Sequence, residues 1–296
     1  MKNNLIMFCN SIGIENVGIA PAEYYNDFGV IWKNQLDKNY VSGFEEKDIE
    51  KRLNPKLTLE DAKSVIVCLF PYYTGTEEHS NISKYVYGID YHKIAIKKLE
   101  TISDFLKSTI EGFQYKAFVD NGPLSDRHVA YRAGLGFLGI NSHLITDKYG
   151  SFVFIGYIIN NYPFEPDKPQ DRTCYLCFNC VRNCPGQCIL GDFTINPLRC
   201  KSYITQKKRD LTKEDIGILK KHRLIWGCDV CQDVCPHNKN VQKTTIKEFR
   251  ENLTYNIDCE ELKQMSNKEF IRRYGDRAFS WRGKAILIRN HQLINE

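Results

Sequence analysis

The sequence predicts a mixed α/β domain, then a cysteine-rich domain, then a short helical tail. In the first 165 residues, short apolar runs alternate with a helical apolar repeat. Nine of the 12 cysteines lie between Cys174 and Cys235, and residues 241–296 are mostly charged and compatible with helix. A chain of 296 residues is long enough for about two domains. We therefore expect domains at residues 1–165 and 166–240, with the tail at 241–296.

Three strands and a long helix are expected in the first domain. Residues 64–70 form an unbroken apolar run that ends at a proline, which predicts a buried strand. Residues 90–113 repeat apolar side chains every three or four positions, as a helix does. Residues 116–119 predict a second strand, which runs into a turn at 120–123, and residues 151–160 predict a third.

Two shorter features complete the first domain. Ser125 is a suitable N-cap for a short helix that Gly134 ends. The proline-rich polar stretch at residues 162–172 is interpreted as the domain linker.

Composition and charge restrict the class of protein. The 42% hydrophobic and 26% charged residues exclude wholesale disorder and a coiled-coil rod. Apolar runs such as residues 152–159 fall short of the roughly 20 needed to span a bilayer, and the N-terminus resembles no signal peptide. We therefore expect a cytoplasmic protein without a membrane partner. Residues 201–296 hold 20 Lys and Arg against 13 Asp and Glu, whereas residues 1–200 hold 21 against 23. This excess indicates either a polyanionic partner or a solvated basic face.

Two groups of cysteines carry the spacing of bacterial ferredoxins. The first has the spacing C-x2-C-x2-C-x3-C-P and consists of Cys174, Cys177, Cys180 and Cys184. The second has the spacing C-x2-C-x3-C-P and consists of Cys228, Cys231 and Cys235. In such pairs the last cysteine of a group binds the cluster of the other group. This predicts a ferredoxin-like double [4Fe–4S] domain: Cys174, Cys177, Cys180 and Cys235 hold one cluster, and Cys184, Cys228, Cys231 and one further cysteine hold the other.

The eighth cluster ligand is either Cys200 or Cys188. We prefer Cys200, because Cys188 lies only four residues past Cys184 and would have to bend back to the same cluster. Two zinc sites are the alternative, but they explain neither the middle cysteine of the first group nor the two Cys-Pro endings. Two clusters conduct electrons, so residues 1–165 are expected to receive them. A plain two-cluster electron carrier would not need such a domain.

Several motifs, in order along the chain, resemble the epoxyqueuosine reductase family. They lie at residues 52–55, 87–92, 119–127, 133–139, 150–152, 199–205 and 227–236. The resemblance runs from about residue 12 to residue 290 and indicates a short form without the C-terminal helical repeats of many members. It implies an N-terminal cobalamin-binding domain and an enzyme that reduces epoxyqueuosine to queuosine in the tRNA anticodon loop. Electrons from an unidentified low-potential donor would pass through the two clusters to cobalamin.

The resemblance also implies roles for single residues. Cys200 would complete the second cluster, and Asp120 matches the proton donor of the family; otherwise Asp120 would cap its own turn. Family positions near the cobalamin correspond to Arg52, Asn141, Ser142, Ser151 and Phe152 of this chain. The chain departs from the family at Ile140, Gln206 and Cys188. Another corrinoid iron–sulfur reductase, dehalogenase-like or corrinoid-reactivating, is the alternative enzyme.

Overall fold

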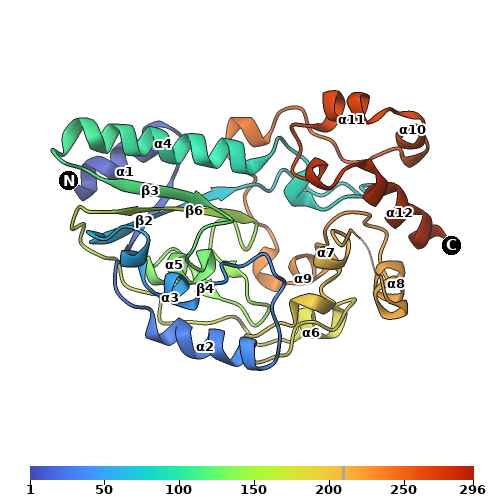
Figure 1. Cartoon of the computed structure of the whole chain (residues 1–296), viewed down its shortest axis with the longest axis horizontal. Coiled ribbons are helices and arrows are strands. Elements are labelled where there is room, and N and C mark those ends of the chain that lie inside the picture. The colour runs from blue at the N-terminus through green and yellow to red at the C-terminus, as the bar shows by residue number, and fades with distance from the viewer. Residues whose placement is uncertain (209–210) are drawn as a thin grey trace.

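The computed structural model describes residues 1–208 and 211–296, and its centre is a four-stranded antiparallel sheet (Figure 1). The strand order is β1 (Asn16–Pro21), β2 (Ser64–Pro71), β6 (Val153–Asn160) and β3 (Tyr115–Val119). The strands expected at 64–70, 116–119 and 151–160 are thereby confirmed. The sequence analysis missed β1, because Asn16, Gly18 and Pro21 interrupt its apolar residues.

Helices cover both faces of the sheet, as Figure 1 shows. One face carries α1 (Lys2–Ser11) and α4 (Tyr91–Thr109), and the other carries α2 (Asn26–Asp37) and α5 (Asp126–Arg132). Successive side chains of β2 enter the two cores in turn, so all eight of its residues are buried. The helix expected at 90–113 is confirmed as α4, and it ends earlier because Gly112, with a φ of 70°, turns the chain into β3.

The remaining elements are short. A two-stranded hairpin joins β4 (Phe137–Leu138) to β5 (Leu144–Ile145), and α3 (Ile49–Leu53) precedes β2. The cysteine-rich segment holds α6 (Asn179–Asn183), α7 (Lys201–Ile204), α8 (Lys213–Lys220) and α9 (Val230–Asp233). The tail holds α10 (Cys259–Gln264), α11 (Asn267–Tyr274) and α12 (Lys284–Asn295). In the ranges that the structure describes, no helix is both long and apolar enough to cross a membrane.

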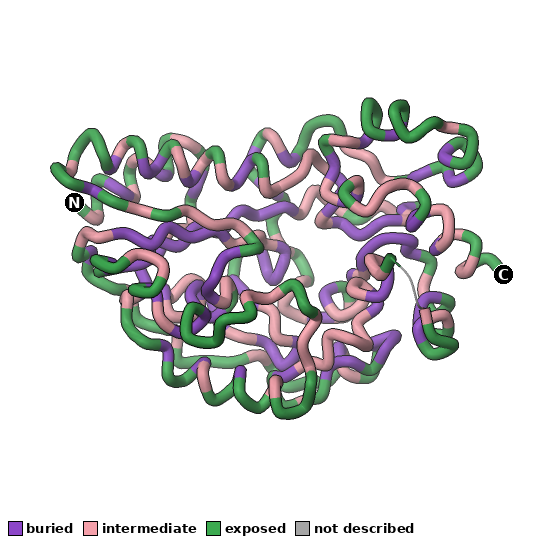
Figure 2. Tube along the Cα trace, viewed as in Figure 1, coloured by how far each residue is buried: buried purple, intermediate pink, exposed green. Residues whose placement is uncertain are grey.

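The first domain, the cysteine-rich segment and the tail are packed against one another. Ile82 and Val86 of the first domain share one hydrophobic core with Trp226 and with Phe270 and Leu287 of the tail. Figure 2 shows buried backbone continuing from the sheet into this region.

The stretch at residues 162–172, which is interpreted as the domain linker, packs against the first domain. The Asp167 carboxylate accepts a hydrogen bond from the Ile19 amide of β1 at 2.9 Å and lies 2.6 Å from the Lys2 ammonium. The Asp167 amide in turn donates to the Ile19 carbonyl at 2.8 Å. These polar contacts satisfy the open edge of β1, so the stretch runs along the sheet.

Candidate active site and cluster sites

A cavity of about 1100 Å³ lies between the sheet, the cysteine-rich segment and the tail. Small-molecule pockets usually measure about 300–1,000 Å³, so this cavity can take a large ligand. Its wall includes Arg52, Tyr85, Tyr91, His92, Asp120, Asp126, Arg127, Gln206, Trp226, Trp281 and Arg282, with residues 43–45 and 153–155.

Asp120 faces this cavity from the loop that follows β3. Its backbone has a φ of 64°, a left-handed conformation that aspartate tolerates better than most residues. Its carboxylate accepts a hydrogen bond from the Tyr91 hydroxyl at 3.1 Å and lies 3.2 Å from Nε2 of His92. The Asp120 side chain therefore contacts the start of α4, while 54% of it stays exposed. These contacts differ from the turn-capping role that was the alternative for Asp120.

The loop that carries Asp120 is held in place by Tyr157 of β6. The Leu124 amide donates a hydrogen bond to the Tyr157 hydroxyl at 3.0 Å. Gly122 lies so close to this ring that a β-carbon there would stand 2.0 Å from the hydroxyl oxygen. Gly122, two residues after Asp120, is therefore required by packing.

His92 is held between two carboxylates. Its Nδ1 lies 2.7 Å from Asp90, and its Nε2 faces Asp120. Burial lowers the pKa of His92, but the hydrogen bonds to Asp120 and Asp90 outweigh it and raise the pKa to about 9. At neutral pH the imidazole is therefore protonated and holds a proton next to Asp120. No role in the site was predicted for His92; its place at the start of α4 was the only signal.

Three charged side chains of the cavity wall carry polar atoms without a partner. Among the described residues, buried atoms of this kind include Nε of Arg52, Oδ1 of Asp126 and Nε of Arg282. The Arg52 guanidinium packs over Trp32, 4.2 Å from the ring centroid, which fixes its position. Burial raises the pKa of Asp126. Because unpartnered buried polar atoms are costly, such a wall suits a large ligand rich in polar groups, as cobalamin is.

The other expected cobalamin contacts lie elsewhere. Asn141 lines a small cavity between cysteines, described below, rather than the large one. The Ser142 hydroxyl donates to the Phe193 carbonyl at 2.7 Å, and the Ser142 carbonyl accepts from Arg127 at 2.6 Å. Neither Asn141 nor Ser142 is among the described residues of the large cavity wall.

Ser151 and Phe152 are also directed away from the large cavity. Ser151 is buried and accepts hydrogen bonds from Gln232 and Asn238 of the cysteine-rich segment. Phe152 stacks on Tyr73, with ring centroids 4.9 Å apart. Within the described ranges, the next residues along β6, 153–155, form the cavity wall instead. The motif therefore located the right strand, but not the residues that face the cavity.

Four cysteines surround the small cavity. They are Cys174, Cys177, Cys180 and Cys235, which the crossed ferredoxin pattern assigns to one cluster. The Ile140 amide donates a hydrogen bond to the Cys174 sulfur at 3.4 Å. Ile140 is a position where the chain departs from the family pattern, and it makes this contact with its backbone. The donor set of four cysteines around one cavity fits a [4Fe–4S] cluster.

A second group of cysteines lies beside the first. Cys184, Cys200 and Cys231 pack in one cluster of side chains. Burial raises the pKa of Cys228 to about 12, and the neighbouring Cys200 thiolate adds to the shift. Burial, and then the Cys228 thiolate, likewise raise the pKa of Cys231. Thiolates crowded in this way need cationic iron to compensate their charge, so this donor set also fits a cluster.

Cys188 lies next to the second group. Its sulfur is 3.4 Å from that of Cys184. A hydrogen bond from the Cys188 thiol lowers the pKa of both Cys184 and Cys200. Cys188 thus contacts two of the expected ligands without being needed to complete either set of four.

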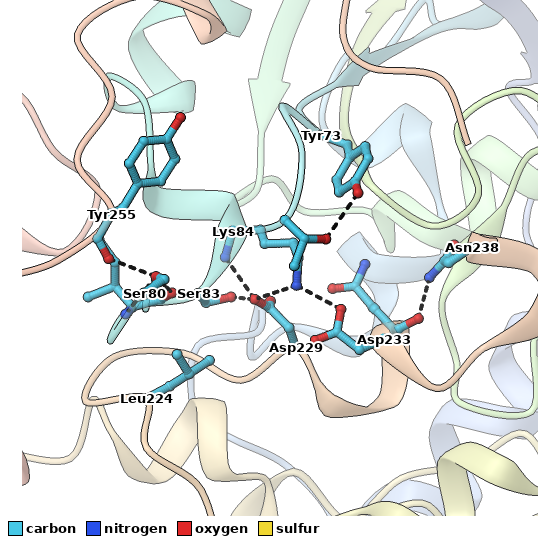
Figure 3. A network of polar contacts seen from close by, with 12 residues as sticks. Tyr73, Ser80, Ser83, Lys84, Leu224, Asp229, Asp233, Asn238 and Tyr255 are labelled. Atoms are coloured by element: carbon cyan, nitrogen blue, oxygen red, sulfur yellow. Dashed lines mark hydrogen bonds and ion pairs between the residues drawn. The ribbon is translucent and has the colours of Figure 1, made fainter. Parts of the chain in front are cut away.

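A network of ion pairs and hydrogen bonds joins Lys84 to the segment that carries the second cysteine group (Figure 3). The Lys84 ammonium lies 2.7 Å from Asp233 and 3.5 Å from Asp229, which are neighbours of the cysteines on α9. The Lys84 amide also donates to Asp229 at 2.8 Å. The next residue, Tyr85, accepts a hydrogen bond from the Trp226 indole at 2.8 Å, and both rings line the large cavity. Lys84, which contacts the segment of this cysteine group, is therefore next in sequence to a residue of the cavity wall.

Comparison with known proteins gives two family matches along the chain. Residues 52–121 match the family described as epoxyqueuosine reductase QueG, and residues 173–238 match the 4Fe-4S double cluster binding domain. An epoxyqueuosine reductase of Lactococcus garvieae is 36% identical over 98% of this chain and 85% of its own length.

Solved structures of epoxyqueuosine reductases are also similar to this chain. A crystal structure of epoxyqueuosine reductase with an epoxyqueuosine-modified tRNA-Tyr stem loop matches with a TM-score of 0.92 and 35% identity, over 99% of this chain and 80% of that one. A Bacillus subtilis epoxyqueuosine reductase, described with an aspartate catalytic loop swung out of its active site, matches with a TM-score of 0.89 and 34% identity, over the same shares.

Proposed function

This chain belongs to the epoxyqueuosine reductase family, and we propose on that premise that its large cavity is where epoxyqueuosine in the tRNA anticodon loop is reduced to queuosine. The observation that carries the proposal is the Asp120–His92 pair, which faces a cavity of about 1100 Å³ beside the cysteine-rich segment. The reaction takes up two electrons and two protons, breaks both bonds of the epoxide oxygen to carbon, and releases that oxygen as water.

The enzyme uses two [4Fe–4S] clusters and cobalamin. Residues that line the large cavity would hold the cobalamin, and with electrons conducted by the clusters it would supply the electron pair for opening the epoxide. Cys174, Cys177, Cys180 and Cys235 are proposed to hold one cluster, and Cys184, Cys200, Cys228 and Cys231 the other. Arg52, with its unpartnered Nε in the cavity wall, is proposed to bind a polar group of the cobalamin. The crystallised relatives and the family named above do not favour a dehalogenase-like enzyme or a plain electron carrier.

Asp120 and His92 are proposed to deliver the protons. Opening the epoxide leaves negative charge on its oxygen, which a positioned acid can neutralise. The Asp120 carboxylate is exposed to the cavity and faces a protonated imidazole, so the proton held by His92 can pass through Asp120 to the opened epoxide. The aspartate loop that swings in the Bacillus subtilis relative supports a role for the loop that carries Asp120.

His92→Gln is expected to lower turnover by about 10²-fold, the lower end of what general acid–base steps contribute. Because the pKa of His92 is raised to about 9, the imidazolium is present below that pH and lost above it. Wild-type turnover should therefore fall as pH rises through about 9, and the variant should lack this fall. Turnover measured from pH 7 to 10 checks this, with the exposed His79→Gln as control. If the turnover of the variant still fell above pH 9 as that of the wild type does, His92 would not take part in proton delivery.

The basic final third is proposed to bind the tRNA backbone. The residues expected to do so were Lys207, Lys208, Arg209, Lys220, Lys221, Arg272, Arg273 and Arg282. Lys207 lies 2.9 Å from the Asp215 carboxylate, and Arg273 is paired with Glu261, so both are partly neutralised. Arg209 lies outside the residues that the structure describes. Lys208, Lys220, Lys221 and Arg272 are exposed and remain the better candidates.

Affinity for tRNA is expected to fall steeply between low and physiological salt, because Lys and Arg that bind phosphates release counterions. Lys220→Gln and Arg272→Gln should each reduce the slope of log affinity against log salt by about 1. Lys63→Gln, which removes an exposed lysine of the first domain, should leave the slope unchanged. Binding that does not vary with salt would contradict the proposal, and the basic face would then be solvated without binding phosphates.

The function is tested in a bacterial strain that lacks its own epoxyqueuosine reductase. Expression of this chain should convert the epoxyqueuosine of its tRNA to queuosine, as read by nucleoside analysis. Persistence of epoxyqueuosine, with the protein present and its clusters assembled, would contradict the proposal. We further propose a cytoplasmic location, because tRNA is the substrate, and a low-potential electron donor, because two clusters feed the cavity.

A further inference from the structure

Three aromatic rings and an arginine gather at the mouth of the large cavity. The Phe44 ring lies 5.7 Å from that of Tyr203 and 6.1 Å from that of Trp281, both edge to face. The Arg282 guanidinium stacks on Trp281, 3.7 Å from the ring centroid, and lies 5.8 Å from the centroid of Phe44. We call these four residues the aromatic rim. They come from three separate parts of the chain, so the fold assembles the rim.

Two residues of the aromatic rim, Phe44 and Trp281, are exposed, and the other two are partly buried. Trp281 is 55% exposed and Phe44 46%, whereas the other two tryptophans, Trp32 and Trp226, are buried. Exposed apolar surface that is clustered, rather than scattered, marks a site of interaction. Phe44, Trp281 and Arg282 also line the large cavity, so whatever covers the rim lies next to a ligand inside it.

The loop that presents Phe44 is held in place. The Glu45 carboxylate accepts hydrogen bonds from the Ser42 amide at 3.0 Å and the Gly43 amide at 2.8 Å. The Ser42 hydroxyl in turn accepts one from the Phe44 amide at 3.2 Å. On the opposite side, Trp281 and Arg282 belong to the short helix Ser280–Arg282, which Gly283 ends with a φ of 80°. Both sides of the rim are therefore fixed before anything binds.

We propose that the aromatic rim stacks on an unpaired nucleobase of the tRNA anticodon loop, adjacent to the nucleotide whose modified base enters the cavity. This inference rests on the proposed function. Bases of single-stranded loops are recognised by stacking on aromatic rings and on arginine planes. Arg282 favours a nucleic acid as the occupant, because its guanidinium stacks on Trp281 and its charge suits a phosphate or a base edge. A heterocycle of the cobalamin is the competing occupant, which the test separates.

The test uses the anaerobic holoenzyme and an unmodified RNA stem loop with the anticodon-arm sequence, labelled for fluorescence anisotropy. Trp281→Ala should weaken RNA binding by roughly 5- to 150-fold, the contribution of one base–aromatic stack. Trp281→Phe, which keeps a stacking face, should restore most of the affinity. Tyr24→Ala, which removes a partly exposed ring from the first domain, should bind as the wild type does.

Three further readouts separate the alternatives. Trp281→Ala should leave the salt slope of RNA binding unchanged, whereas Arg282→Gln should reduce it by about 1. The affinity for cobalamin, followed by its visible spectrum, should be unaltered in Trp281→Ala. Wild-type RNA affinity in Trp281→Ala, or loss of cobalamin binding with RNA binding intact, would overturn the proposal. Because the RNA carries no modified base, this test stays valid even if the chain forms no queuosine.

Discussion

Asp120→Asn is expected to slow reduction of epoxyqueuosine tRNA by about 10²–10⁴-fold, the contribution of a general acid. Asparagine keeps the size of the side chain and can still accept the hydrogen bond from Tyr91, but it cannot take a proton from His92 and pass it to the opening epoxide. The loop should keep its position, because Tyr157 and Gly122 fix it independently of the carboxylate. Single-turnover rates with pre-reduced enzyme measure the effect on the chemical step.

The matched control is Asp104→Asn, which makes the same change on the exposed face of α4 and should react like the wild type. Iron content, cobalamin binding and reduction of the cobalamin by an artificial donor should be normal in Asp120→Asn, because none of them uses the proton. If Asp120→Asn instead lost cobalamin or iron, while the loaded fraction reacted at the normal rate, Asp120 would be a structural residue.

Cys200→Ser is expected to remove about half of the roughly eight iron atoms that two [4Fe–4S] clusters contain. Serine has nearly the same shape but is a poor ligand for this cluster, so the second group of cysteines would keep only three thiolates. With the path of electrons interrupted, turnover should fall to the background rate. Iron and sulfide analysis, together with the electron paramagnetic resonance signals of the reduced protein, would report which cluster is lost.

Cys188→Ala is the control that decides between the two candidate ligands. Its thiol lies 3.4 Å from the Cys184 sulfur, close enough to compete for a place in the ligand set. If Cys200 is the ligand, Cys188→Ala keeps both clusters and all of the iron. Loss of half the iron in Cys188→Ala, with full iron in Cys200→Ser, would reverse the assignment.

Sequence alone could predict the parts of this protein that local chemistry dictates. The cysteine spacing predicts which thiols meet, since three of them follow one another within a few residues in each group. The apolar run of β2 predicts a central strand, because only a strand covered on both faces is apolar at every position. Strand β1 was not predicted, because an edge strand of six residues with Asn16 and Pro21 at its ends has too weak an apolar pattern.

The residues that face the cavity could be predicted only in part, because tertiary contacts select them. His92 became part of the site through the approach of the β3 loop to the start of α4, which no local pattern encodes. Ser151 and Phe152 were placed near the cobalamin by their motif, yet contacts with the cysteine-rich segment and with Tyr73 take up their side chains. The stretch at 162–172 was composed like a linker, but Asp167 binds it to β1.

The most direct measurement supplies the purified anaerobic chain with cobalamin, an artificial low-potential reductant and an RNA stem loop that contains epoxyqueuosine. Digestion of the RNA and mass spectrometry of its nucleosides then follow the modified base. We expect epoxyqueuosine to lose one oxygen atom and become queuosine, and we expect no conversion when cobalamin is omitted. Epoxyqueuosine that persists in the presence of both clusters, bound cobalamin and excess reductant would contradict the proposed function.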